Sequence, residues 1–240
     1  MQDKLIGWVD LDMKNILAKG GIEFLAILIG ITSSLWIDDY STSLNDKKKE
    51  KEALFNISVS LNKDLKHIDW VIRGLNNVNT MLDSMIYNFN SLSKDSVASY
   101  LDRTNMYLIF SPRISTYETL KNTGQLYKIS DLNILEKIIG IYDFHYSIIE
   151  GWSKEDERNI LILQDHLIEH YDIVPSDVWF IKLRDLGKEY DQLKNDQKYF
   201  NYLTVSYKTK LNAIETINFS KKRIVKILTE IDLSIKNMDN

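Results

Sequence analysis

Two long stretches of the chain carry apolar residues at steps of three and four, the spacing typical of an amphipathic helix. The first stretch runs from Leu54 to Phe89, and the second runs from Tyr190 to Ile235. Each could form a helix of about 45 residues, which is roughly 70 Å long. Neither helix could bury its apolar stripe alone. We therefore expect the two long helices to pack antiparallel against each other within a helical bundle.

Shorter helices are predicted between the two long ones. Ser115 and Glu118 have the spacing of a capping box, and the helix that they open should stop by Gly124. Apolar residues at helical steps mark a further helix over residues 132–142. These signals predict a bundle that the shorter helices complete.

A last short helix is predicted from Ser153 and Asp156, which resemble a looser capping box, and it should end before Pro175. The whole chain has 2 prolines and 9 glycines in 240 residues. Because sheet-rich proteins need many turns, this scarcity favours long uninterrupted helices. The predicted fold class is therefore all-α, a transmembrane helix near the N-terminus followed by a helical bundle.

The candidate membrane segment is the apolar run Ile22–Ile37, in which Glu23 is the only charged residue. A bilayer core roughly 30 Å thick requires about 20 apolar residues. The run alone is shorter, so a buried core helix is the alternative. Trp36 and Tyr40 lie where an interfacial aromatic belt is expected. We therefore predict a transmembrane helix over residues 20–40.

The regions on either side of this span have different characters. Residues 1–19 carry apolar residues at helical spacing, with Trp8 beside them as a further interface anchor. This pattern predicts an amphipathic helix lying in the membrane interface. The chain is expected to turn at Gly20–Gly21 and to pass through a polar linker over Tyr40–Asn45. The soluble helical-bundle domain then covers residues 41–240.

Small residues and one carboxylate within the span bear on its association. Ala26, Gly30 and Ser34 are four residues apart and form a stripe that lets helix backbones approach closely. The stripe indicates a homo-oligomer, although it could also face lipid. Glu23 either reaches interfacial water or lines an oligomeric pore or ion path. The expected partners are the lipid bilayer, a second copy and a further membrane or envelope protein.

Composition narrows the function classes. The net charge of −4 gives no basic face of the kind that nucleic-acid binding requires. Cysteine is absent, which excludes disulfides, cysteine nucleophiles and thiolate metal sites. The sequence contains no Gly-rich phosphate loop and no G-x-S-x-G elbow. We expect no enzyme activity and no cofactor.

One string of residues resembles a catalytic motif. His166, Glu169 and His170 match H-x-x-E-H, the inverted zinc motif, in which two histidines one turn apart bind the metal. A zinc site also needs a third protein ligand and a pocket. The interpretation that we favour is a pair of surface histidines on an amphipathic helix.

Other polar and aromatic residues have plain interpretations. Asp64, Asp69 and Asp83 on the first long helix are expected on its solvated face. Aromatic residues such as Phe110 and Tyr146 could line a binding groove, and the alternative is that they fill the bundle core.

Two stretches resemble a known family. They are Glu23, Ile29-Gly30-Ile31 and Ile37-Asp38-Asp39-Tyr40, and then Thr116-Tyr117-Glu118-x-Leu120-Lys121-x-x-Gly124-x-Leu126 with Ile129, Leu132, Leu135, Ile138 and Tyr142. The order and spacing are similar to those of an uncharacterised family of single-pass membrane proteins common in Bacteroidota. The resemblance implies a bacterial inner-membrane location with the helical domain in the periplasm. It implies no activity and no site residues, and lysines on both sides of the span leave the orientation open.

Three functions follow as hypotheses. The first is a non-enzymatic, self-associating interaction, scaffold or accessory subunit held in the membrane. The second is a homo-oligomeric pore or membrane effector, based on Glu23 and the stripe of small residues. The third is a periplasmic bundle that senses a small ligand.

Overall fold

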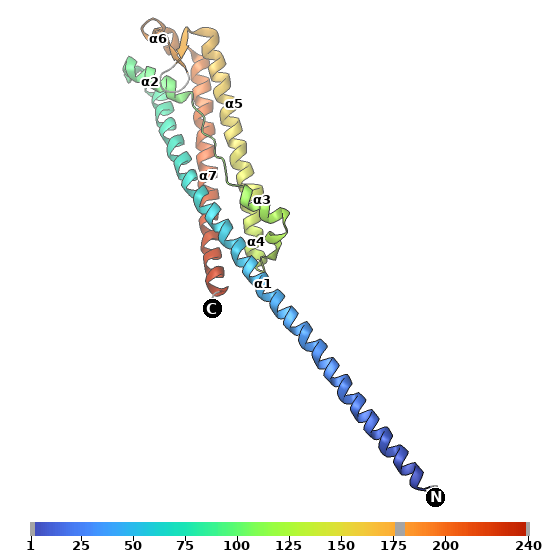
Figure 1. Ribbon diagram of the computed structural model, residues 1–240. Helices are drawn as coiled ribbons and strands as arrows, with labels where there is room; N and C mark the ends of the chain where they lie inside the picture. The colour runs from blue at the N-terminus through green and yellow to red at the C-terminus, as the bar shows by residue number, and fades with distance from the viewer. Residues whose placement is uncertain (1–2, 176–180, 239–240) are drawn as a thin grey trace. The chain divides into compact units, whose positions relative to one another are not determined.

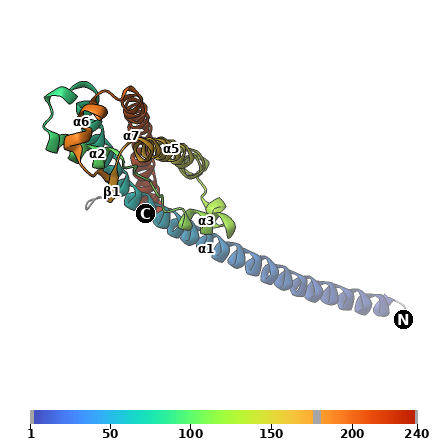
Figure 2. The ribbon, with the colours of Figure 1, turned by 90° about the horizontal axis from the view of Figure 1, so that it is seen from above.

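A computed structural model describes the backbone of residues 3–175 and 181–238, and the side chains of residues 28–175 and 182–238. The chain divides into Met1–Lys51, here unit 1, and Glu52–Asn240, here unit 2. Figures 1 and 2 show the elements, which are mostly helices as predicted. In chain order they are α1 (Asp3–Tyr87), η1 (Phe89–Ser91), α2 (Lys94–Thr104), α3 (Ser115–Asn122), η2 (Gln125–Lys128), α4 (Leu132–Ile139), η3 (Gly140–His145), α5 (Tyr146–His170), β1 (Ile173–Pro175), β2 (Ile181–Leu183), α6 (Leu186–Lys194) and α7 (Gln197–Met238).

The helix α1 is continuous from Asp3 to Tyr87 and contains the first predicted long helix except for its last two residues, of which Phe89 begins η1. The expected turn at Gly20–Gly21 and the expected linker at Tyr40–Asn45 are therefore wrong, because the backbone of both segments is helical. A glycine within a helix costs only about 1 kcal/mol relative to alanine, so it need not end one. Polar residues likewise remain helical where they face solvent.

The second predicted long helix is divided into α6 and α7 at Asn195–Asp196. The Asp196 Oδ1 atom accepts a hydrogen bond from the Tyr199 backbone amide at 2.9 Å, which is the pattern of an N-cap. The apolar spacing continues across this break, and therefore the sequence pattern alone predicted one helix.

The start and end of α3 are as predicted, although its cap is different. The helix begins at Ser115, and Gly124 adopts φ 73°, the left-handed conformation that ends a helix. The N-cap position is Ile114, and it makes no side-chain capping bond. The next helix, α4, is capped instead by Asp131, whose Oδ1 accepts from the amides of Asn133 and Ile134 at 2.9 and 3.2 Å.

The helix α4 passes through the π-helix η3 directly into α5, so residues 132–170 are helical throughout. The predicted helix start at Ser153 is wrong. The Ser153 hydroxyl donates to the Ile149 carbonyl at 3.1 Å, which is compatible with a helix interior. Asp156 is buried and faces α7 instead of capping a helix.

A short antiparallel pair of strands follows α5, where an all-helical chain was expected. Ile173 pairs with Leu183, and Pro175 pairs with Ile181. Strands of three residues are too short to show alternating polarity in the sequence.

Two apolar clusters form the core of unit 2. The first joins α1, α3, α4 and the start of α5 to the C-terminal half of α7, and the second joins the end of α1, α2 and the end of α5 to the start of α7. The helices α5 and α7 lie side by side in Figures 1 and 2. The long helices α1 and α7 share the first cluster, and the Lys221 ammonium on α7 donates to Asp69 on α1 at 2.6 Å. The closest neighbour of α7 is nevertheless α5, and not α1 as predicted.

Candidate functional site

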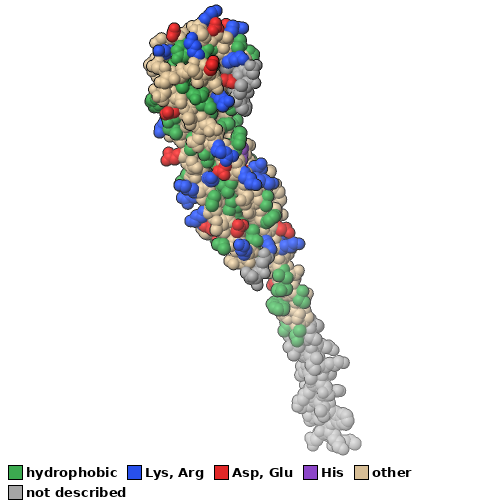
Figure 3. All heavy atoms as spheres, turned by 90° about the vertical axis from the view of Figure 1, so that its left-hand side faces the viewer, with side chains coloured by type: hydrophobic (Ala, Val, Ile, Leu, Met, Phe, Trp, Pro, Cys, Tyr) green, Lys and Arg blue, Asp and Glu red, His purple; other side chains and the backbone are tan. Residues whose placement is uncertain are grey.

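The described part of unit 1 exposes a group of large apolar side chains, interrupted by polar residues such as Ser34, Asp38 and Asp39. Its large exposed apolar residues are Leu28, Ile29, Ile31, Leu35, Trp36, Ile37, Tyr40 and Leu44. Figure 3 shows apolar side chains gathered where the described part of this helix begins. Exposed apolar side chains that gather in this way are normally covered by protein or by lipid.

The predicted interface anchors and part of the stripe lie within this segment. Trp36 and Tyr40 stack with ring centroids 6.5 Å apart. Gly30 and Ser34 are exposed, and a Cβ atom added at Gly30 would have no atom within 4 Å. One face of the helix is therefore open at these two small residues.

Other predicted membrane residues cannot be placed. Trp8, Glu23 and Ala26 lie outside the residues whose side chains the structure describes. Among the described residues, no helix has the combination of length and apolarity that crossing a membrane requires. The predicted transmembrane helix over residues 20–40 begins before residue 28, the first residue whose side chain the structure describes.

The zinc-like motif lies at the end of α5, and its two histidines do share a face. The rings of His166 and His170 lie 4.4 Å apart. His166 is only 4% exposed, so the expectation of two surface histidines is wrong for it. Glu169 and His170 are exposed, as expected of that face. The described residues contain no group of three histidine, aspartate or glutamate side chains that could hold a metal ion.

The buried His166 ring has Asp196 as its polar partner. The Asp196 Oδ2 atom lies 2.7 Å from His166 Nε2 and accepts the Tyr171 hydroxyl at 2.8 Å. Burial alone would raise the pKa of Asp196, but hydrogen bonds from the Tyr199 amide, His166 and Tyr171 hold it below its ordinary value. The cluster therefore ties the end of α5 to the start of α7 and accounts for the break between α6 and α7.

A layer of buried polar residues lies between the two apolar clusters. The Lys210 ammonium on α7 donates to Asp156 on α5 and to the Ser206 hydroxyl, the latter at 3.1 Å. Asn159 donates to the Thr209 hydroxyl at 3.0 Å within the same layer. Burial raises the pKa of Asp156 and lowers that of Lys210. This layer is buried, and its ion pair and hydrogen bonds link α5 to α7 between the two apolar clusters.

The largest aromatic cluster lies where the connection between α2 and α3 meets η3 and α5. Tyr117 and Tyr142 stack with centroids 4.4 Å apart and ring planes 2° apart. Tyr146 lies edge-on to Tyr142 and to Phe110, at 5.3 Å from each. The π-helix η3 contributes Tyr142, and such wide turns occur frequently at functional sites.

Asp64 lies behind these rings, with its side chain fully buried. Its Oδ2 atom accepts the Tyr146 hydroxyl at 2.9 Å, and its Oδ1 atom accepts the Arg113 amide at 3.1 Å. Burial raises its pKa above the ordinary value, although these hydrogen bonds act in the opposite direction. The prediction that Asp64 lies on the solvated face is therefore wrong, whereas Asp69 is partly exposed.

An open cleft of about 410 Å³ runs along this cluster, which we call the tyrosine cleft. Its lining is Ile109, Phe110, Ser111, Pro112, Ile114, Tyr117, Glu118, Tyr142, Asp143, Tyr146, Ser147 and Glu150. The aromatic residues Phe110 and Tyr146 thus contribute both to the core and to a groove. The sequence predicted these two roles as alternatives. It marked Tyr142 as an apolar position at the end of a predicted helix, and Tyr117 only through the family resemblance.

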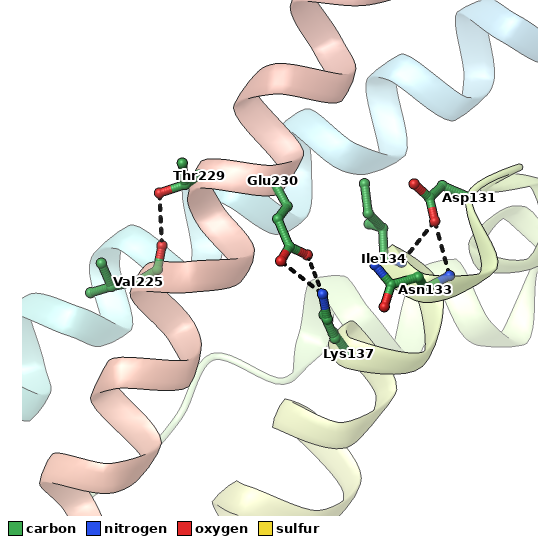
Figure 4. Close-up of polar contacts among 7 residues, drawn as sticks. All are labelled: Asp131, Asn133, Ile134, Lys137, Val225, Thr229 and Glu230. Carbon is green, nitrogen blue, oxygen red and sulfur yellow. Dashed lines mark hydrogen bonds and ion pairs between the residues drawn. The ribbon is translucent and has the colours of Figure 1, made fainter.

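The helices α4 and α7 are joined by an ion pair, as Figure 4 shows. The Lys137 ammonium reaches both carboxylate oxygens of Glu230 at 2.7 Å.

The face of the molecule drawn in Figure 3 mixes positive, negative and apolar side chains, without a large field of one sign. We take the tyrosine cleft as the candidate ligand site, because stacked tyrosines and carboxylates line it together.

The sequence matches no protein-family model, no curated protein and no solved structure. The resemblance to the single-pass family therefore stays a prediction.

Proposed function

We propose that this chain is a single-pass, membrane-anchored helical protein that acts as a self-associating, non-enzymatic interaction or accessory subunit. The proposal includes a bacterial inner membrane and a periplasmic helical domain. One observation supports it, namely the exposed apolar side chains that gather on the helix between Leu28 and Leu44, most densely from Leu28 to Ile37. In water such a surface is costly, at about 25 cal/mol for each Å² of apolar area. Lipid would cover the helix on all sides at once.

The anchoring is tested by membrane extraction of the full chain. Bacterial membranes that contain the protein are washed with alkaline carbonate, and the fraction of chain that stays in the pellet is measured. The wild-type chain should stay, and an Ile29→Lys/Ile31→Lys variant should be released or left uninserted. A charged residue near the middle of a membrane span costs about 3 kcal/mol, and two should prevent stable insertion.

The matched control places the same two lysines elsewhere on α1. Phe55 and Val59 are exposed apolar residues of unit 2, so Phe55→Lys/Val59→Lys should stay in the pellet like the wild type. Release of the wild-type chain by carbonate, or equal retention of the Ile29→Lys/Ile31→Lys variant, would refute the anchoring.

Self-association is tested separately, by the mass and protein composition of the detergent-solubilised complex. We expect a homo-oligomer, and Gly30→Leu should reduce its mass to that of the monomer if the small residues form the contact. A wild-type monomer would contradict self-association. A second protein in the complex would identify the partner of an accessory subunit.

The two alternatives differ in their support. The pore hypothesis depends on Glu23, whose side chain lies outside the described residues, and it stays a prediction. The ligand-sensing hypothesis has a specific observation in its favour, which is the tyrosine cleft.

A further inference from the structure

We propose that the tyrosine cleft is a binding site for a small organic cation, an amine attached to an aromatic or apolar body. The inference concerns unit 2 alone and does not depend on the membrane anchoring. The cleft volume of about 410 Å³ lies within the roughly 300–1,000 Å³ range of small-molecule sites.

The charge of the lining selects the sign of the ligand. Three carboxylates line the cleft, those of Glu118, Asp143 and Glu150, and its lining includes no lysine, arginine or histidine. Lys121 pairs with Asp143 at 2.9 Å, and Lys154 pairs with Glu150 at 2.7 Å. Glu118 makes no ion pair with any described residue, so its charge is available to a ligand.

The aromatic walls favour a cation with an apolar body. Tyrosine and phenylalanine rings attract ammonium groups to their faces, most strongly where water is excluded. One ammonium of the chain already binds in this manner, because Lys121 Nζ lies 5.2 Å from the Tyr117 ring centroid while it contacts Asp143. Tyr142 and Lys121 already occupy the two faces of the Tyr117 ring, so a ligand ammonium that pairs with Glu118 would contact another aromatic ring of the lining.

A buried hydroxyl gives an independent indication of a ligand. Tyr142 is 5% exposed, and its hydroxyl has no hydrogen-bond partner among the described atoms. Leaving such a group unpaired costs about 1–3 kcal/mol, and Tyr142 lines the cleft although its hydroxyl oxygen is closed to solvent. A polar group on the ligand body would satisfy it, with a small movement of the ring that opens the hydroxyl to the cleft.

Three probes with one ring and different charges test the proposal. Tyramine is a cation, tyrosol is neutral and 4-hydroxyphenylacetate is an anion, and otherwise they are closely similar. Calorimetric titration of the full chain in detergent should show saturable binding of tyramine, at least about tenfold tighter than that of tyrosol, and no binding of the anion. Equal binding of all three, or binding of none, would overturn the proposal.

Substitution of a carboxylate in the cleft lining tests where the ligand ammonium binds. Glu118→Gln removes a charge-assisted hydrogen bond and should weaken tyramine about tenfold, while tyrosol is unaffected. The matched control is Glu155→Gln on α5, outside the cleft lining, which should bind tyramine like the wild type. Equal weakening by both variants would exclude a local role for Glu118.

Tyr142→Phe tests the second contact without removing the ring. If the hydroxyl bonds the ligand, this variant should weaken tyramine several-fold and leave phenethylamine, which lacks the ring hydroxyl, unchanged. Unchanged tyramine affinity would show that the Tyr142 hydroxyl does not contact the ligand. The far-ultraviolet circular dichroism spectrum of each variant establishes that it is folded.

Discussion

Asp64 and Asp156 are both buried aspartates in the same bundle, yet their partners differ. Asp156 faces the buried ammonium of Lys210 in a layer that is closed on both sides by apolar clusters. Asp64 faces a neutral hydroxyl, a backbone amide and the half-exposed guanidinium of Arg113, beside an open cleft. The buried ion pair links two helices inside the bundle, whereas Asp64, paired mainly with neutral donors and with one half-exposed guanidinium, lies beside an open cleft.

The largest expected loss of stability is at the layer of buried polar residues between the two apolar clusters. Lys210→Ala would leave Asp156 buried without its counter-charge, and it should lower the free energy of unfolding by about 3–5 kcal/mol. Urea denaturation followed by circular dichroism measures the change. The double variant Lys210→Met/Asp156→Leu removes both charges and should regain most of the lost stability. A double variant as unstable as Lys210→Ala would show that packing, and not the unpaired charge, causes the loss.

The next largest change in stability is expected at the tyrosine cleft, where Tyr146 and Tyr142 allow a matched pair of substitutions. Tyr146→Phe removes the hydroxyl that donates to Asp64 at 2.9 Å, and it should destabilise the bundle by about 1–3 kcal/mol. Tyr142→Phe removes a hydroxyl without a partner and should be neutral or slightly stabilising. Both are measured by the same denaturation. Equal effects of the two substitutions would mean that the bond to Asp64 contributes nothing.

The pH dependence of stability distinguishes Asp64, which lies beside the cleft, from Asp156 in the buried polar layer. Burial raises the folded-state pKa of Asp64 above the ordinary value of 3.8, so the folded state keeps its proton to a higher pH than the unfolded state does. The stability of the wild type relative to Asp64→Asn should therefore fall as the pH rises from 3.8 through the raised pKa, and then stay constant. Asp156 titrates in both proteins and cancels in the difference. A pH-independent difference would contradict the raised pKa.

The smallest effect concerns a second lysine on α7. Lys221 pairs with Asp69 at 2.6 Å, but the two side chains are 36% and 42% exposed. Lys221→Ala should therefore cost only about 0.2–1 kcal/mol, because solvent screens the pair and replaces it. Compared with Lys210→Ala on the same helix, this variant shows how much of the effect is due to burial. A loss as large as that of Lys210→Ala would contradict the assigned role of burial.

The spacing of apolar residues predicted the helices well, because the residues that a helix buries recur every three or four positions. The amphipathic stretch from Leu54 is helical to Tyr87, and Gly124 ends α3, since both depend on neighbours within a few residues. The break at Asp196 was missed, because the bonds from His166 and Tyr171 that accompany it come from about 30 and 25 residues away.

The sequence by itself determined that the chain is mostly helical, that an apolar segment lies near its N-terminus and that no thiol chemistry is possible. Only the tertiary structure decided which charged residues are buried. Asp64, Asp156 and Lys210 have ordinary spacing on amphipathic helices, and nothing local distinguishes them from solvated charges. Their burial depends on which helix covers which face. That choice is made by packing between elements distant in sequence, and the tyrosine cleft exists only because of it.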